Sequence, residues 1–457
     1  MDWSQFSLNR PQDIKLKPKK ALRPHQKTAL EKVESGFQTA DRGKLIMACG
    51  TGKTFTSLKI AEHLTPDQGT VLFLVPSISL LSQTLREWTA ETERPFHSFA
   101  VCSDSKVGKK TDNEDISVHD LAFPATTDTQ KLVKQIQGFK NNKAFTVIFS
   151  TYQSIGVVAQ AQNQGLPEFD LIICDEAHRT TGVTLAGNDE SHFVKVHDQG
   201  FIKAKKRLYM TATPRIFSDG TKSQAQDNDA VLCSMDDASL YGEEFHSLGF
   251  SQAVSEGLLS DYKVMVLAVD EKYVSKTFQS QIADANNEIN LDDAVKITGC
   301  WNGLAKRMAK DLDGNDIEND LAPMRRAVAF SGSIKDSKKI KDLFAQVVSQ
   351  YSQNHEEDDD SLLSCEVDHV DGMFNILQRN KCLDWLKEDT TDQGNLCRIL
   401  SNARCLSEGM DEPALDAVLF LNPRNSILDV VQSEGASCGK PTVKKRFLLS
   451  LIYWIEK

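Results

Sequence analysis

Residues 47–54 read MACGTGKT, and this stretch decides the fold of the chain. It follows the apolar run Leu45–Ala48 and opens the amphipathic stretch Thr54–Leu64, which is the strand–loop–helix order that a phosphate-binding loop requires. Glycines let backbone N–H groups close around phosphate oxygens, and the N-terminus of the next helix adds a favourable dipole. We therefore expect Lys53 to reach the β- and γ-phosphates of a nucleotide and Thr54 to hold Mg²⁺. A chance Gly-rich turn is the alternative.

The rest of the chain alternates short apolar runs with amphipathic stretches such as Ser79–Glu91. The runs are mostly continuous, which is typical of strands buried on both faces. Strand, helix and strand in alternation predict parallel α/β units with right-handed crossovers. The predicted strands form a first set, Leu45–Ala48, Val71–Val75, Thr146–Phe149, Leu171–Cys174 and Arg207–Met210, and a second set, Val264–Val269, Ala327–Phe330, Cys397–Leu400 and Ala417–Leu421.

These two sets of strands predict two similar α/β domains. We place the first domain at residues 1–218, a polar connector at 219–261 and the second domain at 262–433. A polar stretch near 283–320, with a helix, reads as an insertion into the second domain. A chain of 457 residues is long enough for this division.

Bulk composition leaves the function open but narrows the class of protein. The apolar share of 40% and the charged share of 26% fit a soluble globular protein. Ten cysteines without a CxxC pair or a histidine cluster argue against zinc and against a disulfide framework. The N-terminus lacks an apolar signal, so we expect a cytoplasmic protein without a membrane span. The net charge of −11 requires any nucleic-acid contact to be local.

A second chemical signal follows the predicted strand Leu171–Cys174, where residues 175–178 read DEAH. A carboxylate at the carboxyl end of a strand can hold a metal, while its neighbour orients the attacking water. We expect Asp175 on the metal side and Glu176 as the water-activating base. A solvated acidic turn is the alternative. His178 is not expected as a ligand, because no second histidine stands four residues on and Mg²⁺ prefers oxygen.

With both signals in place, the chain resembles superfamily 2 DExH helicases and translocases, and most closely bacterial restriction-enzyme motor subunits. The resemblance rests on ACGTGKT at 48–54, DEAH at 175–178 and NARCLSEGMDEP at 402–413, in the order of that family. It implies an α/β fold of two RecA-like parallel-sheet domains in tandem, a P-loop NTPase with ATP and Mg²⁺ between the domains. It also implies a motor that moves on DNA, duplex or single-stranded.

Shorter motifs extend the resemblance along the chain. LRPHQ at 22–26 resembles the adenine-reading segment, VPS at 75–77 and STYQS at 150–154 the strand-contacting motifs, and TATP at 211–214 the motif that links hydrolysis to domain movement. Taken alone, TATP also fits an ordinary strand exit, and STYQS a capped helix start. The candidate residues are Lys53, Asp175 and Glu176 for catalysis; Arg23, Gln26, Gly50, Thr51, Gly52, Lys53, Thr54, Gly409 and Asp411 for the nucleotide; Thr54 and Asp175 for the metal; and Ser77, Thr151, Arg404 and Ser407 for nucleic acid.

The last motif of this family departs from its pattern here. The family reads Gln-x-x-Gly-Arg-x-x-Arg, and its arginines act on the ATP, whereas residues 432–440 read QSEGASCGK, with Ala436 and Gly439 in the arginine positions. An arginine finger is worth about 10³–10⁵ in rate. A truncated ATP-binding remnant with little hydrolysis is therefore the rival interpretation. A nuclease-bearing enzyme is less expected, because no carboxylate–carboxylate–lysine constellation is found. Nuclease, methyltransferase or specificity partners are then expected on other polypeptides.

One missing base accounts for the departure, and this is a first testable prediction. Restoring a T within the Glu434 codon converts residues 434–445, EGASCGKPTVKK, into VGRVMRKADGKK, with arginine at both positions. Residues 434–457 are then an out-of-frame tail, and the second domain is incomplete and lacks its final strand and helix. Reading the DNA across these codons tests the hypothesis, and codons that do not permit this shift rule it out.

Overall fold

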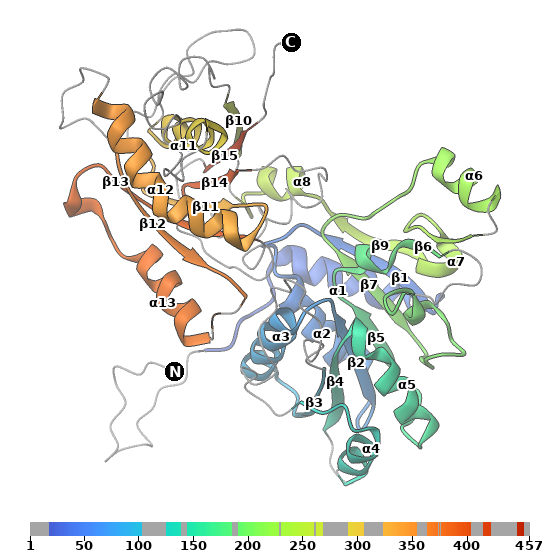
Figure 1. Cartoon of the computed structure of the whole chain (residues 1–457). Coiled ribbons are helices and arrows are strands. Elements are labelled where there is room, and N and C mark those ends of the chain that lie inside the picture. The colour runs from blue at the N-terminus through green and yellow to red at the C-terminus, as the bar shows by residue number, and fades with distance from the viewer. Residues whose placement is uncertain are drawn as a thin grey trace, which may run out of the picture. The chain divides into compact units, whose positions relative to one another are not determined.

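The computed structural model describes residues 18–102, 125–138, 144–184, 191–227, 230–259, 262–267, 291–305, 323–353, 363–372, 374, 376–403, 415–421 and 446–451 (Figure 1). These residues fall into two compact units. The first holds the described residues up to Ser247 except 48–51, and the second holds 48–51 and the described residues from Leu248 onward. We describe each unit by itself.

The first unit is built on a seven-stranded sheet with the order β3-β4-β2-β5-β7-β1-β9. The pairs β1–β7, β5–β7, β2–β5, β2–β4 and β3–β4 are all parallel. The carboxyl ends of these strands therefore share one edge of the sheet. The strands are β1 (Arg42–Met47), β2 (Thr70–Val75), β3 (Phe96–Val101), β4 (Phe145–Thr151), β5 (Leu171–Cys174), β7 (Arg207–Thr211) and β9 (Glu243–Leu248), and β6 (Gly182–Thr184) pairs antiparallel with β8 (Val231–Cys233).

All five strands expected in the first set are confirmed, and the two expected helices are α2 and α3. Every residue of β2, β4, β5 and β7 is buried, which explains their continuous apolar runs. No helix among the described residues is long and apolar enough to cross a membrane. The helices of this unit are α1 (Pro24–Gly36), α2 (Lys53–Leu64), α3 (Ile78–Glu91), α4 (Thr129–Gln137), α5 (Ile155–Asn163), α6 (Asp219–Asp227) and α7 (Ala238–Tyr241), with the 3₁₀ turns η4 (Tyr152–Ser154), η5 (Ala177–Thr180) and η6 (Val194–His197).

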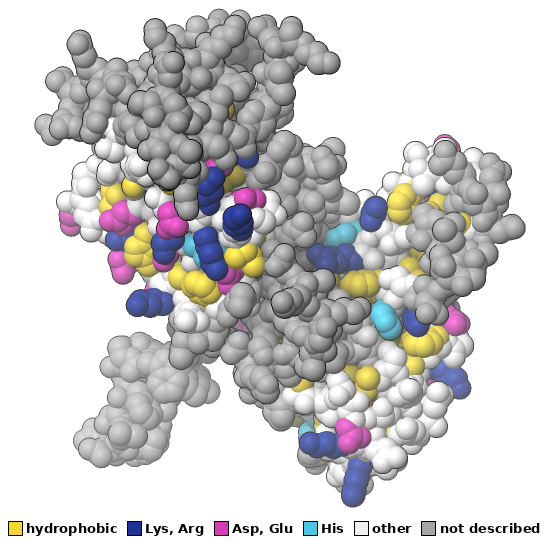
Figure 2. Space-filling view, viewed as in Figure 1, with side chains coloured by type: hydrophobic (Ala, Val, Ile, Leu, Met, Phe, Trp, Pro, Cys, Tyr) yellow, Lys and Arg dark blue, Asp and Glu magenta, His cyan; other side chains and the backbone are white. Residues whose placement is uncertain are grey.

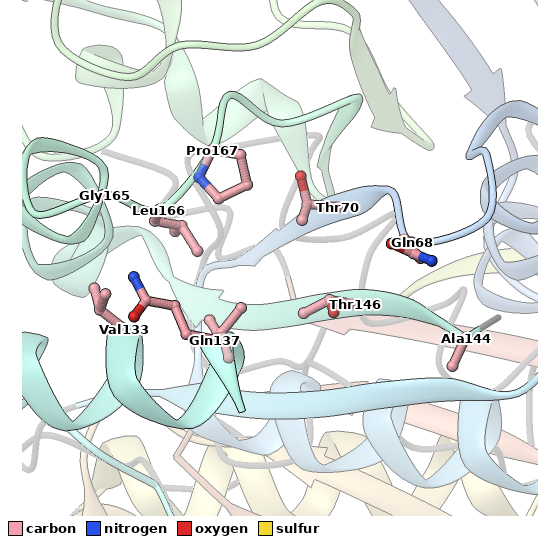
Figure 3. Close-up of a pocket in the computed structure, with 10 residues that line it drawn as sticks. Gln68, Thr70, Val133, Gln137, Ala144, Thr146, Gly165, Leu166 and Pro167 are labelled. Carbon is pink, nitrogen blue, oxygen red and sulfur yellow. The ribbon is translucent and has the colours of Figure 1, made fainter. Parts of the chain in front are cut away.

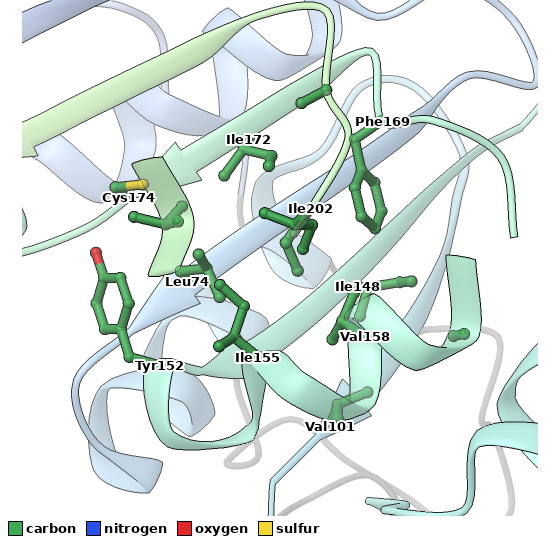
Figure 4. Packing of buried hydrophobic residues seen from close by; sticks show 14 of the residues in the cluster. Leu74, Val101, Ile148, Tyr152, Ile155, Val158, Phe169, Ile172, Cys174 and Ile202 are labelled. Carbon is green, nitrogen blue, oxygen red and sulfur yellow. The ribbon is translucent and has the colours of Figure 1, made fainter. Parts of the chain in front are cut away.

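A cluster of buried side chains holds one face of this sheet against α4 and α5 (Figure 4). It includes Leu74 from β2, Ile148 from β4 and Ile172 from β5. Tyr241 also belongs to the cluster and is fully buried, although it lies in the stretch 219–261 that was expected to be a connector. Since β9 is a further neighbour of β1, the part of that stretch up to Ser247 is packed into the first unit.

The second unit contains a six-stranded sheet in which all the pairs are parallel, with the order β10-β15-β14-β11-β13-β12. The four strands expected in the second set are confirmed. Its strands are β10 (Tyr262–Leu267), β11 (Arg326–Phe330), β12 (Ser364–Val370), β13 (Leu396–Asn402), β14 (Ala417–Phe420) and β15 (Arg446–Leu451), and its helices are α8 (Phe250–Ser255), α11 (Leu291–Leu304), α12 (Ile334–Gln353) and α13 (Ile376–Lys387), with a 3₁₀ turn, η8 (Thr391–Gln393).

Two observations bear on the expectations about the second unit. Residues 434–457 do contribute a strand, because β15 pairs with β14 on one side and β10 on the other. An apolar run can fill a place between two parallel strands, where both rows of backbone groups find partners. The helix α11, within the expected insertion, packs into the core of this unit, where Ala294, Ile297 and Trp301 are buried. The reading-frame hypothesis concerns the DNA and stays a prediction.

The packing of α11 generates the second prediction. Ile297 is fully buried, so Ile297→Ala removes core volume and is expected to lower the free energy of unfolding by about 2–5 kcal/mol. Asn302 is only half-buried on the same helix, and Asn302→Ala is expected to cost less than about 1 kcal/mol. Urea unfolding of both variants measures the difference. Equal, small effects would show that α11 is a peripheral insertion after all.

Candidate nucleotide and nucleic-acid site

The phosphate loop lies between β1 and α2, as predicted. Gly50 and Gly52 have φ angles of 79° and 90°, in the left-handed region that favours glycine. The Thr51 hydroxyl donates to Ala48 O at 2.6 Å, and Lys53 Nζ donates to Met47 O at 3.3 Å. The loop thus forms a compact turn at the N-terminus of α2, where backbone N–H groups can receive phosphate.

Gln26 braces this loop from α1. Its Nε2 donates to Gly52 O at 3.3 Å, and its Oε1 accepts from the backbone N–H of Arg23 at 2.9 Å. A Cβ placed on Gly52 would lie 2.4 Å from Gln26 Nε2, so both the φ angle and the packing require glycine. The side chain of Gln26 is buried, while Arg23 is exposed. The structure therefore joins the predicted adenine-reading segment to the phosphate loop through Gln26.

The two acidic candidates follow β5 at the carboxyl edge of the sheet. Asp175 is buried, and its Oδ1 accepts from the backbone N–H of Glu176 at 3.0 Å. Glu176 adopts φ 48° and ψ 47°, a left-handed conformation that costs a non-glycine residue about 1–3 kcal/mol. Such strain clusters at functional sites, and the sequence gives no signal for it.

His178 connects the acidic pair to β7. Its Nδ1 lies 3.0 Å from Thr211 Oγ1 and 3.4 Å from Glu176 Oε2. Thr211 Oγ1 also accepts from the backbone N–H of Thr213 at 3.2 Å, within the TATP motif. Sequence reasoning assigned no role to His178 beyond excluding it as a ligand, although its place in the DEAH stretch was a usable signal. Here it is a link between two of the predicted motifs.

The charge of Glu176 is set by opposing effects. Burial by itself raises the pKa of this carboxyl, but the His178 ring and the charges of Lys53 and Arg179 lower it by more, to about 2. Glu176 is therefore ionised at neutral pH. An ionised carboxylate has only acceptor oxygens, so it can orient a water molecule by accepting its hydrogen bond. The effect of Lys53 also shows that the phosphate loop and the DEAH stretch share one electrostatic environment.

The donor set fits a magnesium ion. The Thr54 hydroxyl and the Asp175 carboxylate are oxygen donors, which Mg²⁺ prefers, and Mg²⁺ keeps several of its waters in such sites. Within the described residues, Glu176 Oε2 is buried, and its polar neighbour His178 Nδ1 lies 3.4 Å away, too far for a strong hydrogen bond. A buried carboxylate oxygen of this kind is expected to be satisfied by water or an ion. No three His, Cys, Asp or Glu side chains among the described residues gather into a protein-only metal cluster.

The predicted nucleic-acid residues of the first unit lie at the same edge but serve local roles. Ser77 caps α3, since its Oγ accepts from the backbone N–H of Leu80 at 3.3 Å. Thr151 Oγ1 donates to Ser154 Oγ at 3.2 Å, and both Ser77 and Thr151 are buried. In this structure Ser77 thus acts as a helix cap. Contact with nucleic acid stays a prediction for both residues.

The predicted site residues of the second unit lie outside the described residues. These are Arg404, Ser407, Gly409 and Asp411, and the same holds for the altered motif at 432–440.

A pocket of about 370 Å³ lies elsewhere in the first unit (Figure 3). It is formed at the amino ends of β2 and β4, where Thr70 and Thr146 are register partners, beside α4. The described residues that line it are uncharged. The lining residues are Gln68, Thr70, Val133, Ile136, Gln137, Ala144, Thr146, Gly165, Leu166 and Pro167.

Parallel α/β units with a phosphate loop and an acidic pair at one sheet edge are typical of P-loop nucleotide hydrolases. Comparison with known proteins agrees. Residues 19–216 match the family described as "Type III restriction enzyme, res subunit". The resemblance to restriction-enzyme motor subunits is confirmed.

Three similar proteins show the extent of the likeness. The chain is 44% identical, with a TM-score of 0.83, to the solved structure "ATP-dependent Type ISP restriction-modification enzyme LlaBIII bound to DNA", covering 99% of this chain and 29% of that one. It is 37% identical, with a TM-score of 0.63, to a nuclease-deletion mutant of the Type ISP restriction-modification enzyme LlaGI in complex with a DNA substrate mimic, over 95% and 27%. It is 25% identical to "Probable helicase A859L" of African swine fever virus (isolate Pig/Kenya/KEN-50/1950), over 90% and 38%. The chain thus spans well under half the length of these relatives.

The phosphate loop generates the third prediction. Gly52→Ala is expected to weaken binding of Mg²⁺–ATP at least about tenfold, because the new methyl group strains the left-handed turn and displaces Gln26. Titration with a fluorescent ATP analogue measures the affinity. Gly156→Ala on α5 is the matched control, since a Cβ there has nothing within 4 Å. An unchanged affinity in Gly52→Ala would mean that this loop does not hold the phosphates.

Proposed function

We propose that this chain is the ATP-hydrolysing motor of a restriction-modification enzyme and that it moves on DNA. The observation that carries the proposal is the meeting of the phosphate loop with an ionised Glu176 at the carboxyl edge of one parallel sheet. The similarity to two restriction-modification enzymes whose structures contain DNA or a DNA mimic supports the choice of track.

In this proposal the chain's own residues divide the work. Backbone N–H groups of the loop Gly50–Thr54 and the Lys53 ammonium hold the phosphates. Thr54 and Asp175 hold Mg²⁺, which supplies charge neutralisation to the phosphates when it is bound. Glu176 orients the attacking water by accepting its hydrogen bond. His178 fixes Glu176 relative to Thr211, so that the TATP motif senses the state of the acidic pair.

On the side of nucleic acid, we propose that Ser77 and Thr151 donate their hydroxyls to phosphates after local rearrangement, as small polar side chains do in backbone contacts. In the face drawn in Figure 2, basic side chains in the region of α12 and α13 stand beside acidic ones. This agrees with contacts that are local. Arg404 and Ser407 complete the proposed track in the second domain, with Gly409 and Asp411 toward the nucleotide.

A second candidate function rests on the altered last motif. Without arginine at positions 436 and 439, the chain would bind ATP and hydrolyse it slowly, as a remnant of a longer motor. For both candidates we propose a cytoplasmic location, and nuclease, methyltransferase or specificity functions supplied by other polypeptides.

The fourth prediction separates the two candidates. For the motor, duplex or single-stranded DNA is expected to stimulate ATP hydrolysis by the purified chain, and Glu176→Gln is expected to lower the stimulated rate at least about a hundredfold while ATP binding persists. Steady-state phosphate release measures the rate. Arg179→Gln, which removes a neighbouring charge but no proposed ligand, is the control. ATP binding without stimulation by any nucleic acid would instead identify the remnant.

A further inference from the structure

We propose that Trp88 and Tyr152 are positioning residues that couple nucleic-acid contact to the metal site. This inference rests on the proposed function, because it concerns how the same site is regulated. Each of the two side chains donates a hydrogen bond to the main-chain carbonyl of one proposed metal ligand. Each also belongs to an element that begins at a proposed nucleic-acid residue.

Trp88 holds the first ligand, Thr54. Its indole N–H donates to Thr54 O at 3.1 Å, across 34 residues of sequence. The ring is fully buried and meets Phe73 and Phe149 edge-on, with centroids 5.2 Å and 5.4 Å away. Trp88 lies in α3, and Ser77 caps the N-terminus of that helix. A displacement of Ser77 by a bound phosphate would therefore move the group that fixes Thr54.

Tyr152 holds the second ligand, Asp175. Its hydroxyl donates to Asp175 O at 2.8 Å, and the side chain is fully buried. The ring stacks on Phe193 with a centroid distance of 5.0 Å, and Figure 4 shows it beside Cys174 at the end of β5. Tyr152 directly follows Thr151, the other proposed nucleic-acid residue of this unit. In two places, therefore, an element that begins at a proposed nucleic-acid residue carries the side chain that donates to a proposed metal ligand.

A third hydrogen bond connects the segment around Thr151 with the segment around Ser77. Gln153 Nε2 donates to Pro76 O at 3.2 Å, which joins the turn after Thr151 to the residue before Ser77. A phosphate that engages either hydroxyl would therefore act on one connected segment of backbone. A displacement of that backbone would reach Thr54 and Asp175 through the buried rings of Trp88 and Tyr152, because close-packed protein interiors deform little.

A merely structural role is the competing explanation, since buried Trp and Tyr normally find a partner for their polar group. That explanation predicts lower stability and no effect on communication. Each of the two donors makes its hydrogen bond to a proposed metal ligand. Among the described residues, neither is seen to donate to another residue of the phosphate loop or the DEAH stretch, and this pairing favours coupling.

The fifth prediction tests the coupling by binding, so that slow hydrolysis does not obscure it. The affinity for a fluorescent, non-hydrolysable ATP analogue is measured over a series of Mg²⁺ concentrations, with and without a duplex oligonucleotide. In the wild-type chain, DNA is expected to shift this affinity. Trp88→Phe and Tyr152→Phe each keep the ring and remove the donor, and each is expected to reduce the DNA-induced shift about threefold to tenfold, the worth of one net hydrogen bond.

Tyr209→Phe is the matched control, because its buried hydroxyl pairs with His197 Nδ1 at 3.0 Å on the neighbouring strand β7. It is expected to keep the wild-type shift. Urea unfolding of the three variants shows which of them are folded. Trp88→Phe and Tyr152→Phe test the inference separately, because each removes a different hydrogen-bond donor. A wild-type shift retained in folded Trp88→Phe and Tyr152→Phe overturns the inference, as does loss of the shift in Tyr209→Phe. The inference is also overturned if the wild-type chain binds nucleotide and DNA does not alter the affinity. If the wild-type chain does not bind nucleotide with Mg²⁺ at all, the proposed function itself is refuted.

Discussion

The parallel direction of the strands is the constraint on which the site depends. Parallel strands of one sheet present their carboxyl ends at one edge, and the predicted motifs of the first unit after α1 lie at such ends. The phosphate loop follows β1, the acidic pair follows β5, and the TATP motif follows β7. The order β5-β7-β1 keeps these three strands adjacent although more than a hundred residues separate the first from the last. The pairing of adjacent parallel strands, and not closeness in the sequence, therefore brings the three motifs together.

Burial at this edge creates an electrostatic problem that the neighbouring residues resolve. Burial opposes ionisation of Glu176, yet the pKa of its carboxyl falls to about 2 because His178 and the charges of Lys53 and Arg179 surround it. Since the folded-state pKa lies below the ordinary 4.5, the ionised carboxylate contributes stability above that pH and loses it as the pH falls toward 2. This contribution offsets part of the strain of the left-handed backbone at the same residue. The position is therefore held by its partners and not by local preference.

The strands that the sequence predicted are those buried at nearly every position. The runs at 71–75 and 171–174 are continuous because both faces of the sheet are covered. The strands β3 and β12 lie at sheet edges and mix exposed with buried residues, so their sequences, FHSFAV and SCEVDHV, do not stand out. The helix α11 was read as an insertion because polar residues surround it, while its buried face is visible only once it packs on the sheet.

Local sequence was sufficient for the site residues but not for their connections. The glycines at 50 and 52 and the acidic pair at 175 and 176 follow from residue type and spacing, since no other residues supply those conformations and charges. The bonds from Trp88 to Thr54 and from Tyr152 to Asp175 join elements whose proximity depends on sheet order, and no spacing rule foretells them. His178 lay within a recognised motif, and its partner Thr211 became evident only from the adjacency of β5 and β7.

The distribution of the site along the chain bears on what the altered last motif can affect. Every described candidate for the nucleotide and the metal lies between Arg23 and Glu176, on elements fixed by the first sheet or by the loop that follows β1. The positions expected to hold arginine, 436 and 439, lie outside the described residues. An arginine finger acts on charge that develops during phosphoryl transfer, so its absence slows turnover more than it weakens ATP binding. We therefore expect ATP binding to persist even where hydrolysis is slow.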